Sequence, residues 1–175
     1  LSYRLIPPIP PRVVWLGNYA TLLQEPRFWS ALFTTTLIAF IAVGLQYAIG
    51  FGVALALNAR VPGERLFRVA LLLPMLLAPV AVALVARMMF NPTMGPLNQF
   101  LSKFGLVNLP FLTNGHWALA CIIAVEVWQW TPFVILMMLA GLQTLPEDVY
   151  EAAELENASA WQQFWGITFP MMLPI

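Results

Sequence analysis

Glu126 is the only acidic residue inside the long apolar segments of this chain, and three complementary side chains follow it. Gln129, Trp130 and Phe133 come three, four and seven residues later, so a helix places all of them on one face. A carboxylate and an amide hydrogen-bond to hydroxyl groups, and aromatic rings stack on the apolar faces of sugar rings. The set therefore suits a sugar or another polyol. The alternative is that a protonated or arginine-paired Glu126 only locks helix packing.

The rest of the sequence offers little for catalysis or metal binding. His116 and Cys121 are the only residues of their types, and their positions give no metal-site spacing. Glu126 has no intramembrane acid, base or metal cluster to work with, which disfavours a membrane-embedded enzyme. No Gly-x-x-x-x-Gly-Lys-Ser/Thr phosphate loop occurs, so this chain is not expected to hydrolyse ATP. We predict no catalytic residues and no metal ligands.

The composition is that of a membrane protein. Of the 175 residues, 61% are hydrophobic and 9% are charged, and the mean hydropathy is +0.79. Ordinary soluble domains carry about 25% charged residues. The formal net charge is zero, which leaves no basic footprint for nucleic acid. The chain starts without Met and stops as a new apolar run begins, so we expect an internal piece of a longer polypeptide.

Three segments are long enough to cross the roughly 30 Å of bilayer hydrocarbon. They cover residues 28–59, 69–90 and 117–142, and a fourth is expected to begin at about 171. A polar lead-in at 1–27, which includes a surface turn of helix, precedes the first span. A turn at 60–68, with Pro62-Gly63 at its apex, joins the first two spans. The loop before the third span contains residues 97–104, whose apolar side chains have helical spacing. The sequence predicts an all-α, polytopic transmembrane bundle. The distribution of Lys and Arg does not decide its orientation.

Prolines interrupt two of the spans. Pro74 and Pro79 remove amide donors in the second span and free the carbonyls of Ala70 and Met75, and Pro132 does the same in the third. In lipid such carbonyls need another partner, so the second span is expected to pack against protein or a water-filled cavity. Two interpretations stay open. The prolines are tolerated kinks, or the breaks line a conduction path.

Residues 144–170 form a polar segment that predicts two short helices. Thr144 and Glu147 read as a capping pair for the first helix, and Asn157 suits the left-handed turn that ends it. Ser159 and Gln162 form a second capping pair, and Pro170 closes the second helix. We call residues 144–170 the acidic hairpin.

The acidic hairpin carries five acidic residues and no basic ones. A helix that binds anionic lipid is expected to be cationic, so a protein partner is favoured. The alternative is a loop that packs on its own spans.

The acidic hairpin resembles the EAA loop of permease subunits of ATP-binding-cassette importers. The family pattern is Glu-Ala-Ala, a Gly four residues on, then Ile and a hydrophobic-Pro pair. Glu151, Ala152, Ala153, Ile167 and Phe169-Pro170 match it, and Asn157 stands at the Gly position. Upstream, Asn91-Pro92, Gly95-Pro-Leu-Asn98 and Val127-Trp-Gln-Trp-Thr-Pro132 are similar to carbohydrate permeases of the maltose and glycerol-phosphate type.

The resemblance implies a type I importer fold and a bacterial inner-membrane location for residues 28–175, with residues 1–27 as an external lead-in and the acidic hairpin in the cytoplasm. It also implies three protein partners: cytoplasmic ATPase subunits that carry ATP and Mg, a second permease subunit, and an external solute-binding protein. The residues that dock the ATPase would be Glu151, Ala152, Ala153, Asn157, Ile167 and Pro170. The other function considered is a passive channel or structural membrane subunit without an ATPase.

Overall fold

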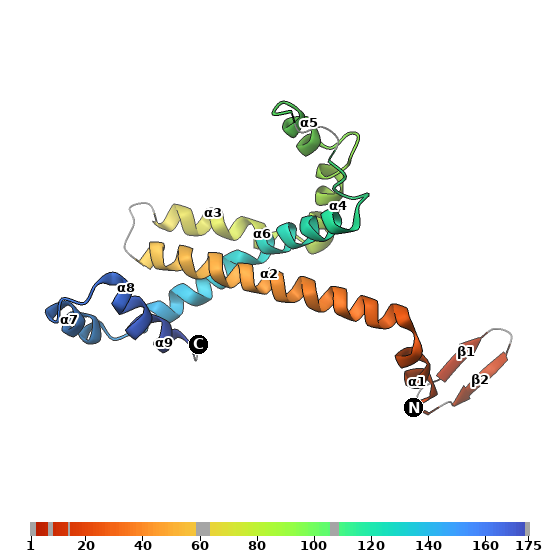
Figure 1. Ribbon diagram of the computed structural model, residues 1–175, viewed down its shortest axis with the longest axis horizontal. Helices are drawn as coiled ribbons and strands as arrows, with labels where there is room; N and C mark the ends of the chain where they lie inside the picture. The colour runs from red at the N-terminus through yellow and green to blue at the C-terminus, as the bar shows by residue number, and fades with distance from the viewer. Residues whose placement is uncertain (1–2, 7–8, 14, 59–63, 106–108, 174–175) are drawn as a thin grey trace. The chain divides into compact units, whose positions relative to one another are not determined.

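The computed structural model describes residues 3–6, 9–13, 15–58, 64–105 and 109–173, which form two compact units, Leu1–Phe40 and Ile41–Ile175 (Figure 1). The apex Pro62-Gly63 of the predicted turn lies outside the described residues. The order of elements is β1–β2 followed by helices, so the predicted helical fold holds from Gly17 onward.

The first unit begins with a β-hairpin that the sequence analysis did not predict. β1 (Tyr3–Ile6) pairs antiparallel with β2 (Ile9–Val13), with Arg4 opposite Arg12. The sequence predicted only a polar lead-in over this proline-containing stretch. In a two-stranded hairpin, however, each strand has an outward edge on which a missing amide costs no ladder bond. The predicted surface helix follows as α1 (Gly17–Gln24).

α2 (Pro26–Asn58) starts in the first unit and continues into the second. Proline is favoured at the first helical position, and no charged side chain follows Arg27 within this helix. α2 and α6 (Gly115–Leu142) are, by length and composition, the two helices in the described part of the chain that are long enough to cross a membrane. That the predicted spans lie in a bilayer stays a prediction.

The second predicted span is two helices and not one. α3 (Glu64–Leu76) contains Pro74, and α4 (Pro79–Met89) begins after a break at Leu77 and Ala78. Ala78 has an extended backbone, with φ −61° and ψ 131°, because the proline ring that follows it disfavours the helical conformation. Pro79 therefore ends the first helix and starts the next.

The short helix predicted at 97–104 is confirmed as α5 (Pro96–Ser102). A tight turn precedes it, in which the Asn91 side chain accepts hydrogen bonds from the amides of Thr93 and Met94. The turn ends at Gly95. Only glycine fits at this position, since a Cβ atom there would lie 2.3 Å from the Asn91 carbonyl oxygen.

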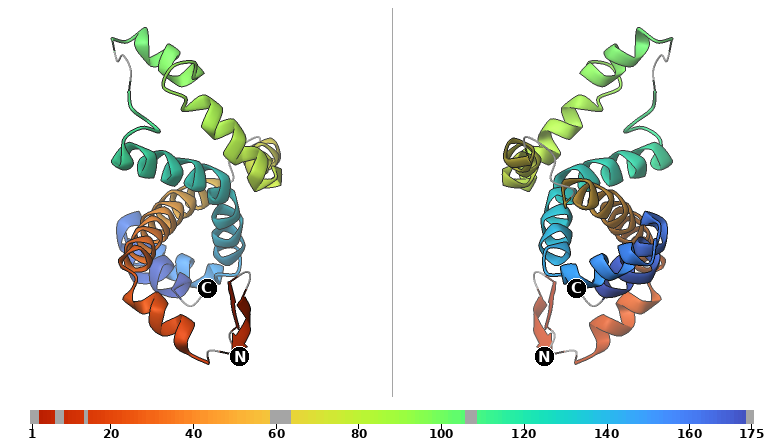
Figure 2. Two further views of the ribbon diagram at one scale, coloured as in Figure 1. Left: turned by 90° about the vertical axis from the view of Figure 1, so that its right-hand side faces the viewer. Right: turned by 90° about the vertical axis from the view of Figure 1, so that its left-hand side faces the viewer.

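The core of the second unit lies where the end of α2, the second half of α6 and α9 (Phe169–Met172) meet. Gly50 of α2 faces Val134 of α6 at this crossing. The buried core residues are Ala54, Leu57, Val134, Ile135, Met138, Leu139, Leu142 and Met172. The other end of α6 is capped by Asn114 and packs, through Trp117 and Phe111, toward Phe90, the residue that follows α4. Figure 2 shows α6 and its neighbours from two further sides.

After α6 the chain forms α7 (Glu147–Leu155), α8 (Ala160–Gln163), the π-helical turn η1 (Phe164–Thr168) and α9. The helical backbone is continuous from Ala160 to Met172.

Candidate functional site: the acidic hairpin and a cavity beside Glu126

The turn of the acidic hairpin has the geometry that its sequence predicts. Asn157 has a φ of 57°, in the left-handed region. Its amide donates to the carbonyl of Glu154 at 2.9 Å, and the amide of Ala158 donates to that of Ala153 at 2.9 Å. These two bonds are the Schellman pattern, which satisfies the carbonyls at a helix end. Asn157 thus replaces glycine at the position that requires positive φ.

The second predicted cap is confirmed and the first is wrong. The Ser159 amide donates to the Gln162 side chain at 2.8 Å, and the Gln162 amide donates to the Ser159 hydroxyl at 3.4 Å. Thr144, in contrast, donates its hydroxyl to the Gly141 carbonyl at 2.7 Å, so it caps the end of α6. α7 starts without a side-chain cap after Pro146, and two acidic residues occupy its first turn.

The structure places the predicted docking residues on different surfaces. Glu151, Ala152 and Asn157 are exposed on α7 and its turn, whereas Ala153 is buried. Ile167 is half-buried in η1, and Pro170 is exposed. The exposed group presents one carboxylate, one methyl group and one amide. Such a surface favours a partner that offers a hydrogen-bond donor to the carboxylate and whose backbone can approach the small methyl group closely.

Pro170 does not close the second helix as the sequence predicted. It lies in the first turn of α9, inside the helical backbone that runs from Ala160 to Met172, where its ring has no amide to donate to the preceding turn. The preceding turn widens to π geometry, in which the Phe169 amide donates to the Phe164 carbonyl. Isolated π turns of this kind are frequent at functional sites.

An aromatic cluster covers one side of the second helix. Phe164 and Trp165 contact each other at 5.2 Å between ring centroids, and both contact Phe169. Phe164 also approaches Phe51 of α2 at 5.7 Å, which joins the acidic hairpin to the core. Phe51 was not identified from the sequence, because a contact between distant segments leaves no periodic signal.

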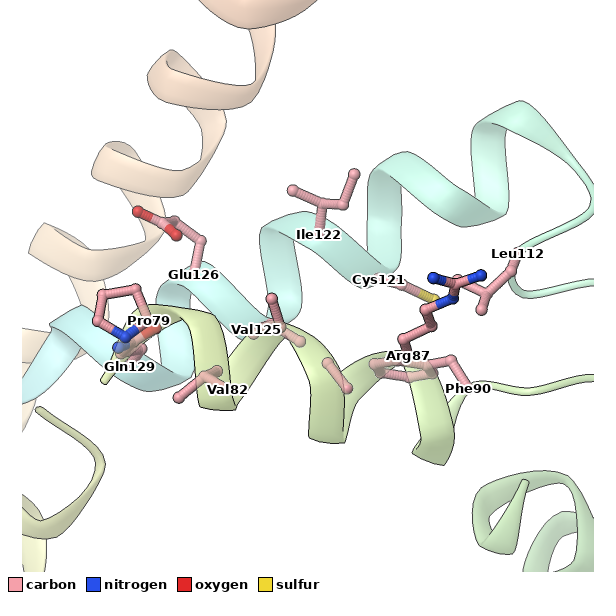
Figure 3. A pocket seen from close by; sticks show the side chains of 12 residues that line it. Pro79, Val82, Arg87, Phe90, Leu112, Cys121, Ile122, Val125, Glu126 and Gln129 are labelled. Carbon is pink, nitrogen blue, oxygen red and sulfur yellow. The ribbon is translucent and has the colours of Figure 1, made fainter. Parts of the chain in front are cut away.

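A cavity of about 290 Å³ lies between α4 and α6, and Figure 3 shows its lining. Glu126 and Gln129 line it, together with Pro79 and Arg87 of α4. The Glu126 carboxylate and the Arg87 guanidinium lie toward opposite ends of the cavity (Figure 3). Charged groups at both ends of a mostly apolar chamber suit a polar solute. Arg87 was not among the residues predicted to line a solute path.

Two predicted solute-path residues stand apart from this cavity. Trp130 is not part of its lining, and Phe133 is 48% exposed on the surface of the chain. Gln129, in contrast, is only 4% exposed, and its amide donates to the Leu77 carbonyl at 3.3 Å. The structure therefore brings together Glu126 and Gln129 of the four residues.

A second buried glutamine fixes α6 against α2. Gln46 is 7% exposed, and its side-chain amide donates to the backbone carbonyl of Glu126 at 3.2 Å. The sequence carried a signal for it, since Gln46 is a strongly polar side chain in an otherwise apolar run. Among the described residues, no group of three or more His, Cys, Asp or Glu side chains could hold a metal ion.

Comparison with known proteins places residues 48–175 in the family described as the binding-protein-dependent transport system inner membrane component. The chain is 35% identical, over 93% of its length and 55% of the relative's, to the trehalose/maltose transport system permease protein MalF of Thermococcus litoralis. It is 31% identical, over 99% of its length and 56% of the relative's, to the sulfoquinovosyl glycerol transport system permease protein SmoG of Agrobacterium fabrum. The chain spans about half the length of the curated relatives it matches.

The fold is also that of a solved transporter. A chain in the crystal structure of a bacterial alginate ABC transporter, in complex with an alginate pentasaccharide-bound periplasmic protein, superposes with a TM-score of 0.79 at 26% identity. The match covers 90% of this chain and 55% of that one. The predicted fold class, an importer permease of helical type, is confirmed.

Proposed function

The chain belongs to the binding-protein-dependent transport system inner membrane component family, and we propose that it is part of a permease subunit of an ATP-driven sugar importer. In this proposal the subunit forms the path for a sugar or related polyol across the bacterial inner membrane. A separate ATPase supplies ATP and Mg, a second permease subunit completes the path, and an external binding protein delivers the solute.

The observation that carries the proposal is the acidic hairpin. Its exposed Glu151 and Ala152 stand on a helix that is ended by the left-handed Asn157. The helix is short and carries its acidic groups outward, while Tyr150 on its other side hydrogen-bonds to Thr168 of η1. A helix held in this way can transmit force from a partner, because its C-terminal end is closed by the Schellman turn and Tyr150 bonds it to η1.

The solute class follows from the cavity and from the relatives. Glu126 and Gln129 offer a carboxylate and an amide, and Arg87 adds a cation at the other end. Hydroxyl groups of a polyol can accept from and donate to these groups. The relatives described above carry names that refer to trehalose, maltose and sulfoquinovosyl glycerol, which supports a saccharide solute.

Replacement of Glu151 tests the proposal. Glu151→Arg reverses the charge on the exposed face of α7, so the ATPase subunit is expected to lose its fit to the acidic hairpin. A mismatched charge in an interface costs several kcal/mol, so uptake of the solute falls by at least about tenfold. The transporter still inserts, and its ATPase activity no longer responds to the loaded binding protein.

Glu25→Arg is the matched control, because Glu25 is an exposed acidic residue outside the acidic hairpin. This variant keeps uptake at the parental level. Parental uptake by Glu151→Arg would reject the coupling role and favour a passive channel or a structural membrane subunit.

A further inference from the structure

The break between α3 and α4 leaves a backbone carbonyl outside both helices. α4 begins its own hydrogen-bond ladder at Ala78, whose carbonyl accepts from the Val82 amide at 3.1 Å. The carbonyl of Leu77 precedes this ladder. In an uninterrupted helix it would accept from the Ala81 amide, but the extended backbone at Ala78 turns it away. Within a bilayer such an acceptor needs a partner from elsewhere in the protein.

The side-chain amide of Gln129 is that partner. It lies 3.3 Å from the Leu77 oxygen, and the side chain that carries it is almost fully buried. Figure 3 shows Gln129 beside Pro79, the residue that causes the break. In a bilayer, a hydrogen bond to an otherwise unsatisfied carbonyl stabilises more than an average one, because its loss also leaves the acceptor unpaired.

Gln129 also stands on a fixed part of α6. One turn earlier, Gln46 of α2 holds the Glu126 carbonyl, so α2 and the α3–α4 break are tied to neighbouring positions of one helix. The two glutamines differ in one respect. The Glu126 carbonyl lies inside a continuous helix and has a backbone partner available, whereas the Leu77 carbonyl lies at a break.

We propose that Gln129 is a positioning residue that fixes the junction of α3 and α4 through the carbonyl of Leu77. Gln129 and Pro79 both line the cavity beside Glu126, so the bond sets the position of one cavity wall. This consequence for transport rests on the proposed function, in which the cavity belongs to the solute path. The hydrogen bond itself does not depend on it.

Hydrogen exchange of the full-length protein, assembled with its partners in lipid nanodiscs, tests the proposal without solute or ATP. Gln129→Leu removes the donor at nearly constant volume. We expect the amides of Val82 and Ala83, in the first turn of α4, to exchange about tenfold faster because the junction opens more often. Gln129→Met keeps the side-chain length and also lacks a donor, so it is expected to raise the exchange rate by the same factor. It replaces the Leu variant in the experiment if that variant does not accumulate.

Two further variants make the test specific. Gln46→Leu removes the other buried amide and leaves exchange at Val82 and Ala83 unchanged. Pro79→Ala restores an amide donor for the Met75 carbonyl and allows a continuous helix, in which the Ala81 amide reaches Leu77. In that background Gln129→Leu has no effect on exchange.

An equal increase with and without Pro79, or no increase in the Gln129 variants, would overturn the proposal. Because the readout needs neither uptake nor ATP hydrolysis, its failure is distinct from failure of the Glu151→Arg test.

Discussion

The hydroxyl groups of Tyr150 on α7 and Thr168 in η1 lie 2.9 Å apart and share a hydrogen bond. Tyr150 precedes the exposed Glu151 by one residue, and Thr168 is buried one residue before α9. The bond therefore joins the exposed helix of the acidic hairpin to the helix that packs on the core. In the proposed function, a partner that displaces α7 would therefore pull on η1 through this bond.

Removal of either hydroxyl tests this joint. Tyr150→Phe and Thr168→Val should each destabilise the acidic hairpin by about 1 kcal/mol. The double variant should cost little more than either single variant, because both substitutions delete the same bond. Thermal unfolding of the purified transporter measures all three. Additive losses would show that the two hydroxyl groups act independently.

Substitution of Asn157 tests the left-handed turn. Asn157→Gly should keep or slightly raise stability, because glycine adopts positive φ without a steric cost. Asn157→Val should lose roughly 1–2 kcal/mol or more, since a β-branched side chain is strained at a φ of 57°. Hydrogen exchange of the Ala158 amide, which closes the turn, reports both effects. Equal exchange in the two variants would contradict the strain argument.

The hairpin was predictable because its signals are local. Asn157, Ser159 and Gln162 act on backbone groups within a few residues of themselves, so their types and spacing determine the turn and the second cap. Thr144 carried the same type of signal, but its hydroxyl donates to a carbonyl at the end of α6 and not to the start of α7. A capping residue between two helices can serve either one, and the sequence does not say which.

The positions of the tertiary bonds were not predictable in the same way. The prolines correctly indicated that the second span needs a partner for freed carbonyls. The carbonyl that Gln129 meets is that of Leu77, however, and not those of Ala70 and Met75 that simple counting gave. Counting four residues back from Pro79 misses this carbonyl. Pro79 also forces the residue before it, Ala78, out of the helical conformation, and this leaves the Leu77 carbonyl without its helix partner. The π turn before Pro170 is likewise an adjustment that residue spacing does not reveal.

Gly50 provides a test of the crossing between α2 and α6. A Cβ atom on Gly50 would lie 2.8 Å from a methyl carbon of Val134, and the stiff valine rotamer cannot move away. Gly50→Leu is therefore expected to cost about 1–3 kcal/mol or to prevent folding. Gly52→Leu is the matched control, since no atom lies within 4 Å of a Cβ atom there. Thermal unfolding in detergent should separate the two variants, and equal melting temperatures would contradict this packing.

Glu126 provides a test of the solute path. Glu126→Ala should reduce uptake by about tenfold, the effect of losing one or two hydrogen bonds to a charged group. Co-purification of the ATPase subunit with the permease is expected to be unchanged. Glu126→Gln distinguishes the hydrogen bonds from the charge, because it keeps the side-chain size and one oxygen acceptor and removes the negative charge. Full uptake by Glu126→Ala would show that this residue serves helix packing and not the solute path.

The central claim is that the acidic hairpin faces the cytoplasm, where an ATPase can reach it. Glu154 is exposed on α7, and Cys121 is the only cysteine in the 175 residues of this sequence. In a transporter whose native cysteines, Cys121 included, are replaced by Ala, Glu154→Cys should resist a membrane-impermeant thiol reagent applied to intact cells and react with it in inside-out vesicles. Labelling of Glu154→Cys on intact cells would place the acidic hairpin outside and contradict the account.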